Sequence, residues 1–254
     1  MRTQDNIDIT APDGQHIRGV YSHSGATAPL VIFAHGFGST RHGEKAAALE
    51  NECARRGWGF IGFDFRGHGA SAGVMRELRA ARLLEDMDLI LARAATRSAG
   101  PVFLVGSSMG GWATAWTATR HPARIAACAL IAPAFSFPEL RQITPAARAA
   151  CLRRGWMRFQ NEYLDVEISA ALLSDTAQFP PASLLGGFHT PCLIFHGMRD
   201  GIVPHGGSMD FVSRCAETDI ELRLYKTGDH RLNEIRREIA AGACDFFAAR
   251  MAVR

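Results

Sequence analysis

One serine lies in a setting that could make it a nucleophile. The motif Gly106-Ser107-Ser108-Met109-Gly110-Gly111 follows the apolar run 102–105 and precedes 112–119, a run compatible with a helix. In the pattern G-x-S-x-G the glycines lack a Cβ atom, so a strand can turn sharply into a helix and hold the central serine strained and exposed. The motif therefore predicts a reactive hydroxyl at Ser108. Such a hydroxyl needs a nearby base, an acid that orients the base, and hydrogen-bond donors for an oxyanion.

Donors for the oxyanion are expected from two loops. The apolar run 29–34 predicts a buried strand and ends in His35-Gly36-Phe37-Gly38. The chain resembles the α/β-hydrolases here, because they place a loop with one oxyanion donor after such a strand. The expected donors are the backbone N–H groups of Phe37 and Met109.

The acid and the base are expected at the ends of two later strands. Asp200 follows the apolar run 191–195, and His230 follows the alternating run 220–225. We therefore predict Asp200 as the orienting acid and His230 as the general base. Asp229 is disfavoured as the acid, because neighbouring residues on a loop point in different directions. The chain order Ser, Asp, His is characteristic of the α/β-hydrolase fold.

Three stretches around these positions are similar to one branch of the α/β-hydrolases, and the resemblance covers nearly the whole chain. They are Val105–Trp112, His196–Pro204 and Gly228–Leu232. The branch comprises the palmitoyl-protein thioesterases of animal mitochondria, also described as acyl-glucuronide esterases, and their bacterial relatives. The resemblance implies an ester or thioester hydrolase. Two departures from the animal proteins are His35, where a different residue is expected, and the lack of a long targeting segment before the first strand.

Strands and amphipathic helices alternate along most of the sequence. Strands are predicted at 6–10 and 15–22, as an antiparallel pair, and at 29–34, 59–63, 102–105, 125–131, 191–195 and 220–225. Helices are predicted at 42–56, 77–97, 109–120, 205–216 and 231–251. This order predicts the α/β class and an α/β-hydrolase fold, with a mostly parallel central sheet and helices on both faces. We expect residues 1–254 to form a single domain.

The alternation breaks between residues 132 and 189, which predicts a small helical cap inserted at 134–188. An insertion at this point of the fold covers the nucleophile and excludes water. The predicted pocket residues of the cap are Trp156 and Phe159. Most apolar residues of the cap have the alternative role of packing on the body of the protein. Four arginines could attract an anionic leaving group or could form a solvated helix face: Arg148, Arg153, Arg154 and Arg158.

The composition disfavours several other classes of protein. The net charge is +3, from 28 basic and 25 acidic residues, so neither nucleic acid nor an anionic membrane is an expected partner. The N-terminus is polar and no apolar span of about 18 residues occurs, so we expect a cytoplasmic protein without stable membrane insertion. The six cysteines form no C-x-x-C pair and the histidines lack metal-ligand spacing, so we expect no metal and no cofactor.

These expectations combine into one function. A triad of Ser108, His230 and Asp200 would cleave carboxylic esters or thioesters through an acyl-enzyme, with small acyl esters, acyl thioesters and S-acylated proteins as candidate substrates. The resemblance favours an acyl-thioesterase that acts as a depalmitoylase. The alternatives are a general carboxylesterase for small oxygen esters and a non-catalytic ligand-binding protein of the same fold. The loop 64–71, which contains His68, is expected to be structural.

Overall fold

An eight-stranded β-sheet runs through the protein in the computed structural model, which describes residues 4–23, 25–137, 139–140, 142–160, 164–215 and 219–251. In spatial order the strands are β1 (Gln4–Thr10), β2 (His16–Ser22), β4 (Gly59–Phe63), β3 (Leu30–Ala34), β5 (Val102–Ser107), β6 (Ala127–Ile131), β9 (Cys192–Gly197) and β10 (Ile220–Tyr225). β1 and β2 pair antiparallel, as do β2 and β4, and all later neighbours are parallel. The sheet confirms the predicted fold class.

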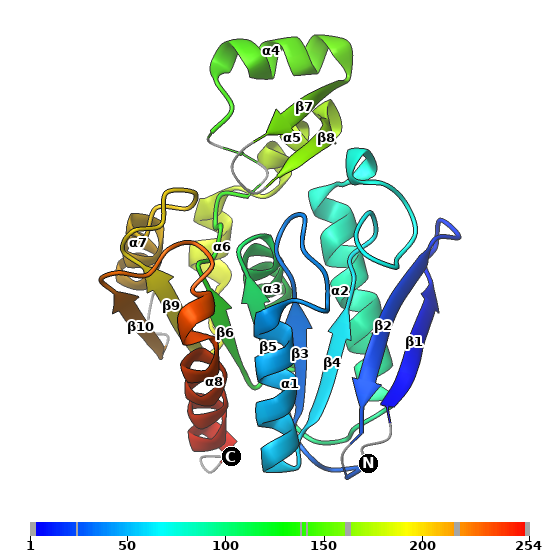
Figure 1. Cartoon of the computed structure of the whole chain (residues 1–254), viewed down its shortest axis with the longest axis vertical. Helices are drawn as coiled ribbons and strands as arrows, with labels where there is room; N and C mark the ends of the chain where they lie inside the picture. Colours follow the sequence, from blue (N-terminus) through cyan, green and yellow to red (C-terminus); the bar gives the residue numbers. More distant parts are fainter. Residues whose placement is uncertain are drawn as a thin grey trace.

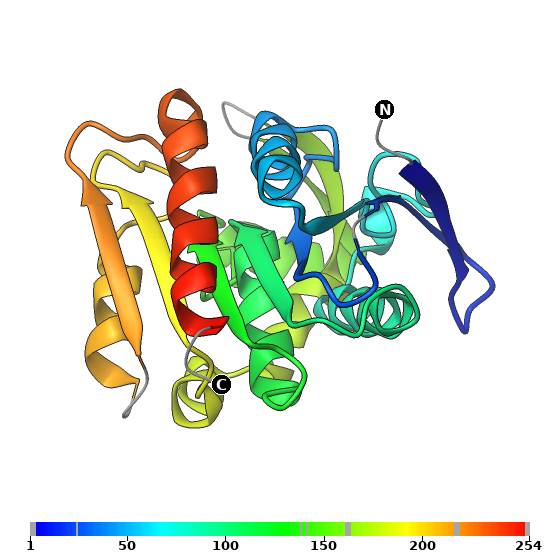
Figure 2. The ribbon, with the colours of Figure 1, turned by 90° about the horizontal axis from the view of Figure 1, so that it is seen from below.

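Helices cover both faces of the sheet (Figures 1 and 2). One face carries α1 (Glu44–Arg56) and α8 (Arg236–Met251), and the other carries α2 (Ala80–Ala95), α3 (Met109–Arg120) and α7 (Gly206–Arg214). Side chains of β3 alternate between the two faces: Val31 and Phe33 pack on the α1 side, and Ile32 packs on the α2 side. Because both faces are covered, β3 is apolar and buried throughout.

Two predicted helices are shorter than expected, each for a local reason. The segment expected as one helix at 77–97 begins as a short 3₁₀ helix, η1 (Met75–Glu77), and α2 starts only after Arg79, whose backbone is extended. The C-terminal helix begins at Arg236 after η3 (Asn233–Ile235), because Leu232 has a left-handed backbone with φ of 51°. The end of the helix expected at 205–216 lies outside the described residues.

The segment between β6 and β9 lies above the carboxyl ends of the parallel strands (Figure 1). It contains the expected helices and also an antiparallel hairpin that the sequence analysis did not predict. Its elements are α4 (Pro145–Arg154), β7 (Trp156–Gln160), β8 (Asp165–Ser169), α5 (Ala170–Ser174), η2 (Asp175–Gln178) and α6 (Pro181–Gly187). We keep 134–188 as the proposed extent of the cap.

Buried charge joins the cap to the body at the start of α2. The Asp175 carboxylate is fully buried and accepts hydrogen bonds from the Arg79 guanidinium (2.6 Å) and from the backbone N–H of Ala80 (2.7 Å). Asp175 is buried whereas Arg79 is partly exposed, so removing Arg79 would leave a buried carboxylate without its charged partner. This pair therefore fixes the cap to the body of the protein.

The loop 64–71 is held by a second buried ion network. The Arg66 guanidinium is fully buried and donates to Asp86 (2.6 Å) and Asp13 (2.9 Å), and it also contacts Glu85. Arg66 therefore ties the loop to buried Asp86 on α2 and to two partly exposed carboxylates, in keeping with the expected structural role of the loop. None of the helices in the described part of the chain is long and apolar enough to cross a membrane.

Candidate active site

Ser108 occupies the turn between β5 and α3 in a conformation that non-glycine residues rarely adopt. Its φ and ψ are 54° and −114°. The surrounding backbone fixes this geometry, since the Ser108 N–H donates to the Ile131 carbonyl (2.9 Å) and its own carbonyl accepts from Trp112 and Ala134 (3.1 Å each). The strained turn places the side chain at the start of α3, as the motif predicts.

Glycine is required on both sides of this serine because the chain passes through very narrow spaces. A Cβ atom on Gly106 would lie 2.2 Å from the Gly110 carbonyl oxygen, and one on Gly110 would lie 2.1 Å from the Ala34 carbonyl oxygen. Both contacts are with backbone, which cannot move aside without disturbing a strand or a helix. The glycines therefore allow β3, β5 and α3 to meet at Ser108.

The structure brings the three residues of the predicted triad together. The His230 Nε2 atom lies 3.1 Å from the Ser108 Oγ atom, and its Nδ1 atom lies 2.7 Å from the Asp200 Oδ2 atom. Because a carboxylate can only accept, Nδ1 is assigned the proton, which leaves Nε2 free to accept from the serine hydroxyl. The arrangement can transfer a proton from Ser108 to His230.

Asp200 is buried, and hydrogen bonds compensate its charge. Its Oδ1 atom accepts from the backbone N–H groups of Ile202 (2.9 Å) and Val203 (2.7 Å). Burial alone would raise the pKa of this carboxyl, but hydrogen bonds from His196 and His230 outweigh burial and hold the pKa well below its ordinary value. Asp200 therefore stays ionised as the partner of His230.

Asp229, the disfavoured alternative acid, faces away from the triad. Its carboxylate accepts from the backbone N–H groups of Arg231 (3.0 Å) and Leu232 (2.8 Å). These bonds shape the loop that carries His230. Asp200 thus supplies the carboxylate on His230, while Asp229 supports the turn.

The two predicted oxyanion donors lie on either side of the nucleophile. Met109 is the first residue of α3, so its N–H belongs to the helix turn that has no carbonyl partner within the helix. The Phe37 N–H donates to no other described residue. A Cβ atom on the preceding Gly36 would lie 3.4 Å from Ser108 Cβ, which places this loop against the nucleophile. Both residues lie beside Ser108, so their amides remain the predicted donors for an oxyanion.

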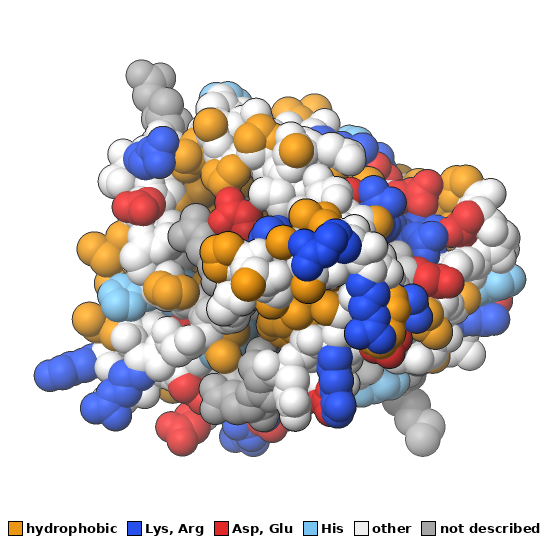
Figure 3. All heavy atoms as spheres, turned by 90° about the horizontal axis from the view of Figure 1, so that it is seen from above, with side chains coloured by type: hydrophobic (Ala, Val, Ile, Leu, Met, Phe, Trp, Pro, Cys, Tyr) orange, Lys and Arg blue, Asp and Glu red, His pale blue; other side chains and the backbone are white. Residues whose placement is uncertain are grey.

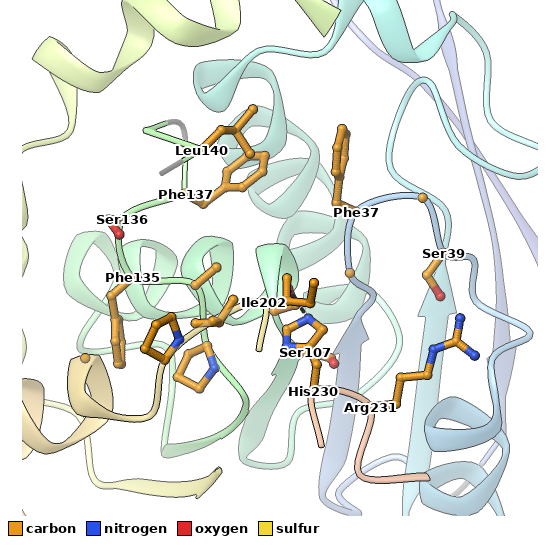
Figure 4. Close-up of a pocket in the computed structure, with 18 of the residues that line it drawn as sticks. Phe37, Ser39, Ser107, Phe135, Ser136, Phe137, Leu140, Ile202, His230 and Arg231 are labelled. Carbon is orange, nitrogen blue, oxygen red and sulfur yellow. Dashed lines mark hydrogen bonds between the residues drawn. The ribbon is translucent and has the colours of Figure 1, made fainter. Parts of the chain in front are cut away.

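A cavity of about 630 Å³ opens above Ser108 and His230 beneath the cap. Phe137 and Leu140 lie on one side of it, and Ser39 and Arg231 lie on the other (Figure 4). Its apolar side is lined by Phe37, Phe135, Phe137, Leu140, Phe159 and Leu184. Phe159, one of the two pocket residues predicted from the sequence, is among them. The cavity is therefore mainly aromatic on the side that the cap covers.

The opposite side of the cavity is polar. Lys45 donates from Nζ to the Arg231 carbonyl oxygen (2.7 Å) and also contacts the Asn233 side chain (3.4 Å). Burial, reinforced by the Arg231 charge, lowers the pKa of Lys45 to about 8. The two sides of the cavity thus offer different environments to the two halves of a substrate.

Trp156 does not line the cavity, contrary to the prediction. It lies on β7, where residues three apart point to opposite sides, so Trp156 and Phe159 cannot face the same space. Phe159 packs toward Phe37, with ring centroids 6.2 Å apart, whereas Trp156 is stacked by the guanidinium groups of Arg76 (4.7 Å) and Arg154 (3.9 Å).

The four cap arginines also lie outside the cavity lining. Arg154 stacks on Trp156, Arg158 pairs with Asp165, and Arg148 contacts the Glu139 carbonyl. Basic side chains are visible on the outer surface of this end of the molecule (Figure 3). The structure therefore supports a solvated role for these arginines rather than contact with a leaving group.

Two buried histidines support the loop that carries the Phe37 amide. His35 donates from Nδ1 to the Gly36 carbonyl (2.8 Å) and accepts at Nε2 from the Phe65 N–H (3.1 Å). The ring of His68 lies 5.0 Å from the His35 ring and 6.2 Å from the Phe37 ring, measured between centroids. Burial lowers the pKa of His35 to about 4 and that of His68 to about 3, so both are neutral at neutral pH.

No group of three His, Cys, Asp or Glu side chains in the described ranges could hold a metal ion. The site also contains two fully buried polar residues that the sequence analysis missed: His196, which contacts Asp200, and Ser208, which contacts His196. The signal for His196 was its place in the motif that contains Asp200, four residues earlier. Ser208 had no signal, because only the fold brings α7 beside that strand.

Comparison with known proteins gives the site its family context. A family model described as serine aminopeptidase, S33, matches residues 25–178 and 171–234. The chain belongs to this family. The family match spans the serine turn, the aspartate loop and His230, and it agrees with the fold of the sheet and its covering helices.

Curated and solved relatives agree with this assignment. The chain is 30% identical over 212 residues to the mitochondrial palmitoyl-protein thioesterase of Homo sapiens, covering 82% of this chain and 68% of the relative. It is 26% identical over 222 residues to the monoacylglycerol lipase of Mycolicibacterium smegmatis, covering 77% and 79%. The solved α/β-hydrolase domain-containing protein 10 from mouse superposes with a TM-score of 0.82 at 25% identity, covering 97% of this chain and 99% of that one. This S33 family member is a serine hydrolase with the α/β-hydrolase fold.

The neutral buried histidines predict a pH-dependent loss of stability. Both bind a proton in the unfolded chain below about pH 6.5 but not in the folded protein until about pH 4 (His35) and pH 3 (His68). Each should therefore lower the free energy of unfolding by about 2 kcal/mol between pH 7 and pH 5. Asp86 acts in the opposite direction over this window, because burial raises its pKa to about 6. Urea unfolding of wild type and His68→Phe at both pH values measures the contribution of His68. Between pH 7 and pH 5 the free energy of unfolding of the variant should fall by about 2 kcal/mol less than that of wild type. An equal fall in both proteins would contradict the neutral state assigned to His68.

Proposed function

We propose that this serine hydrolase cleaves acyl thioesters and esters, with a preference for thioesters of longer chains. The observation that carries the proposal is the hydrogen-bonded series Ser108, His230 and Asp200 at the floor of a cavity whose covered side is aromatic. Intact triad geometry beside the Phe37 and Met109 amides, for which the described residues supply no acceptor, also favours catalysis over the alternative of a ligand-binding protein without activity.

The proposed reaction begins with attack of Ser108 Oγ on the acyl carbonyl carbon. His230 Nε2 takes the hydroxyl proton, and Asp200 stabilises the imidazolium. The N–H groups of Phe37 and Met109 bind the oxyanion, an interaction worth about 3 kcal/mol for each donor. His230 then protonates the departing thiolate or alkoxide, which leaves the acyl group on Ser108. Water, deprotonated by His230, attacks this acyl-enzyme, and His230 returns the proton to Ser108 Oγ as the bond breaks and the acid leaves.

The two sides of the cavity suggest where each half of the substrate binds. An acyl chain fits the aromatic side beneath the cap, where Phe137 and Phe159 would replace water around it. The leaving group would then lie toward the polar side near Lys45. An S-acylated protein is the proposed macromolecular substrate, in line with the thioesterase relatives.

A general carboxylesterase acting on small oxygen esters is the second candidate. The monoacylglycerol lipase relative favours oxygen esters as a class. The same triad would serve either reaction, so only the choice of substrate separates the two candidates.

Initial rates across matched acyl esters and thioesters, from acetyl to palmitoyl, test the proposal. We expect kcat/KM to rise with chain length and to favour thioesters, because longer chains bury more apolar surface in the cavity. Ser108→Ala serves as the blank and should retain the wild-type circular dichroism spectrum with no turnover. A maximum at short oxygen esters would instead support the carboxylesterase, and turnover by pure Ser108→Ala would refute the assigned nucleophile.

Truncation of Phe159 tests the acyl site directly. Phe159→Ala should lower kcat/KM for a long-chain substrate about tenfold and leave the acetyl substrate nearly unchanged, since only a long chain reaches the lost ring. Trp156→Ala is the matched control, because it removes an aromatic side chain of the same hairpin that lies outside the cavity lining. Equal losses for both chain lengths, or equal effects of the two variants, would show that Phe159 serves only packing.

A further inference from the structure

The triad carboxylate has a second histidine as a partner. His196 lies on β9, four residues before Asp200, and its side chain is fully buried. Its Nε2 atom lies 3.2 Å from Asp200 Oδ2 and 2.9 Å from the Val203 carbonyl oxygen. Its Nδ1 atom lies 2.7 Å from the hydroxyl of Ser208, a buried residue of α7. Asp200 Oδ2 is therefore shared by two imidazole rings.

The contacts of His196 define its tautomer. Both neighbours of Nε2 are acceptors, a carboxylate and a carbonyl, so Nε2 is assigned the proton and donates. A neutral ring then accepts at Nδ1, which requires the Ser208 hydroxyl to donate. In the described part of the chain, the titratable side chains that face His196 are Asp200 and, with ring centroids 6.5 Å apart, His205. With Ser208 as donor, every polar atom of the His196 ring is paired.

The result is a hydrogen-bonded chain that is nearly symmetrical about Asp200. A Ser–His pair lies on each side of the carboxylate: Ser108 with His230, and Ser208 with His196. Only the first pair lines the cavity; the second is sealed between β9 and α7. The buried pair therefore cannot act on a substrate; it meets the triad at Asp200 and also holds the carbonyl of Val203, whose N–H donates to the same carboxylate.

We propose that His196, held by Ser208, is a positioning residue that fixes the Asp200 carboxylate for His230. This inference rests on the proposed function of the triad. Two N–H donors on Oδ2 and two backbone donors on Oδ1 leave the carboxylate a single orientation. Without His196, Oδ2 would keep one donor, so its charge would act more fully on His230 and the carboxylate could rotate. The His230 imidazolium would then form more readily but release its proton to the leaving group less readily. The position of the His230 ring would also be less well defined.

Three variants separate positioning from general stability. His196→Leu removes the donor, His196→Gln keeps an N–H at a similar reach, and His205→Leu changes a neighbouring histidine that does not contact Asp200. For each, a serine-directed phosphonate gives the fraction of active sites, and thermal unfolding gives the folded state. The pH dependence of kcat/KM and the low-field proton resonance of His230 Nδ1–H then report on the triad itself.

We expect His196→Leu to lower kcat per active site by roughly 10- to 100-fold, with KM changed much less, because misplacement of a catalytic group acts on the chemical step. The acid limb of its pH profile should move to higher pH, and the His230 Nδ1–H resonance should shift. His196→Gln should restore most of the rate, Ser208→Ala should give a smaller change in the same direction, and His205→Leu should match wild type.

A folded His196→Leu protein with the wild-type kcat per active site, pH limb and resonance would overturn the proposal. So would an equal loss in His196→Gln and His196→Leu, because the donor would then have no role. If wild type itself hydrolyses no acyl substrate, the proposed function fails, yet the resonance still decides the positioning role, since it requires no turnover.

Discussion

A buried carboxylate at the end of β9 governs the geometry of this site. An ionised Asp200 in the interior would be strongly unfavourable without compensation. The backbone of residues 202–203 turns its N–H groups toward one oxygen, and His196 and His230 donate to the other. The course of the loop after β9 and the orientation of His230 follow from this single requirement. The oriented ring then reaches Ser108, the proposed nucleophile.

The strained turn at Ser108 is the second constraint on the site, and the ends of the central strands hold the turn in place. β3, β5 and β6 end at one edge, where α3 begins, and glycines at 106 and 110 let the backbones approach closely enough to hold the turn. The same edge carries the Phe37 loop, the Asp200 loop and, beyond β10, His230. A parallel sheet collects residues distant in sequence at its carboxyl edge, which is why the chemistry lies there.

The sequence was most informative where a rigid element fixes the outcome. Ser108, Asp200 and His230 each follow a strongly apolar or alternating strand, so their common edge could be predicted without knowing any side-chain contact. The cap was harder, because its short elements depend on packing rather than on periodicity. The hairpin β7–β8 places Trp156 and Phe159 on opposite sides, and no pattern in that stretch distinguished a hairpin from a helix. Ser208 could not be found at all, since its partner lies on another element.

The proposed reaction requires that Ser108 becomes acylated during turnover. Intact-protein mass spectrometry after rapid mixing with a long-chain acyl thioester measures this directly. We expect a transient gain of one acyl group, mapped by peptide analysis to Ser108, which decays as free acid appears and is absent from Ser108→Ala. Thioester hydrolysis by Ser108→Ala at the wild-type rate would contradict the proposed mechanism, and so would an adduct on another residue of the wild-type protein.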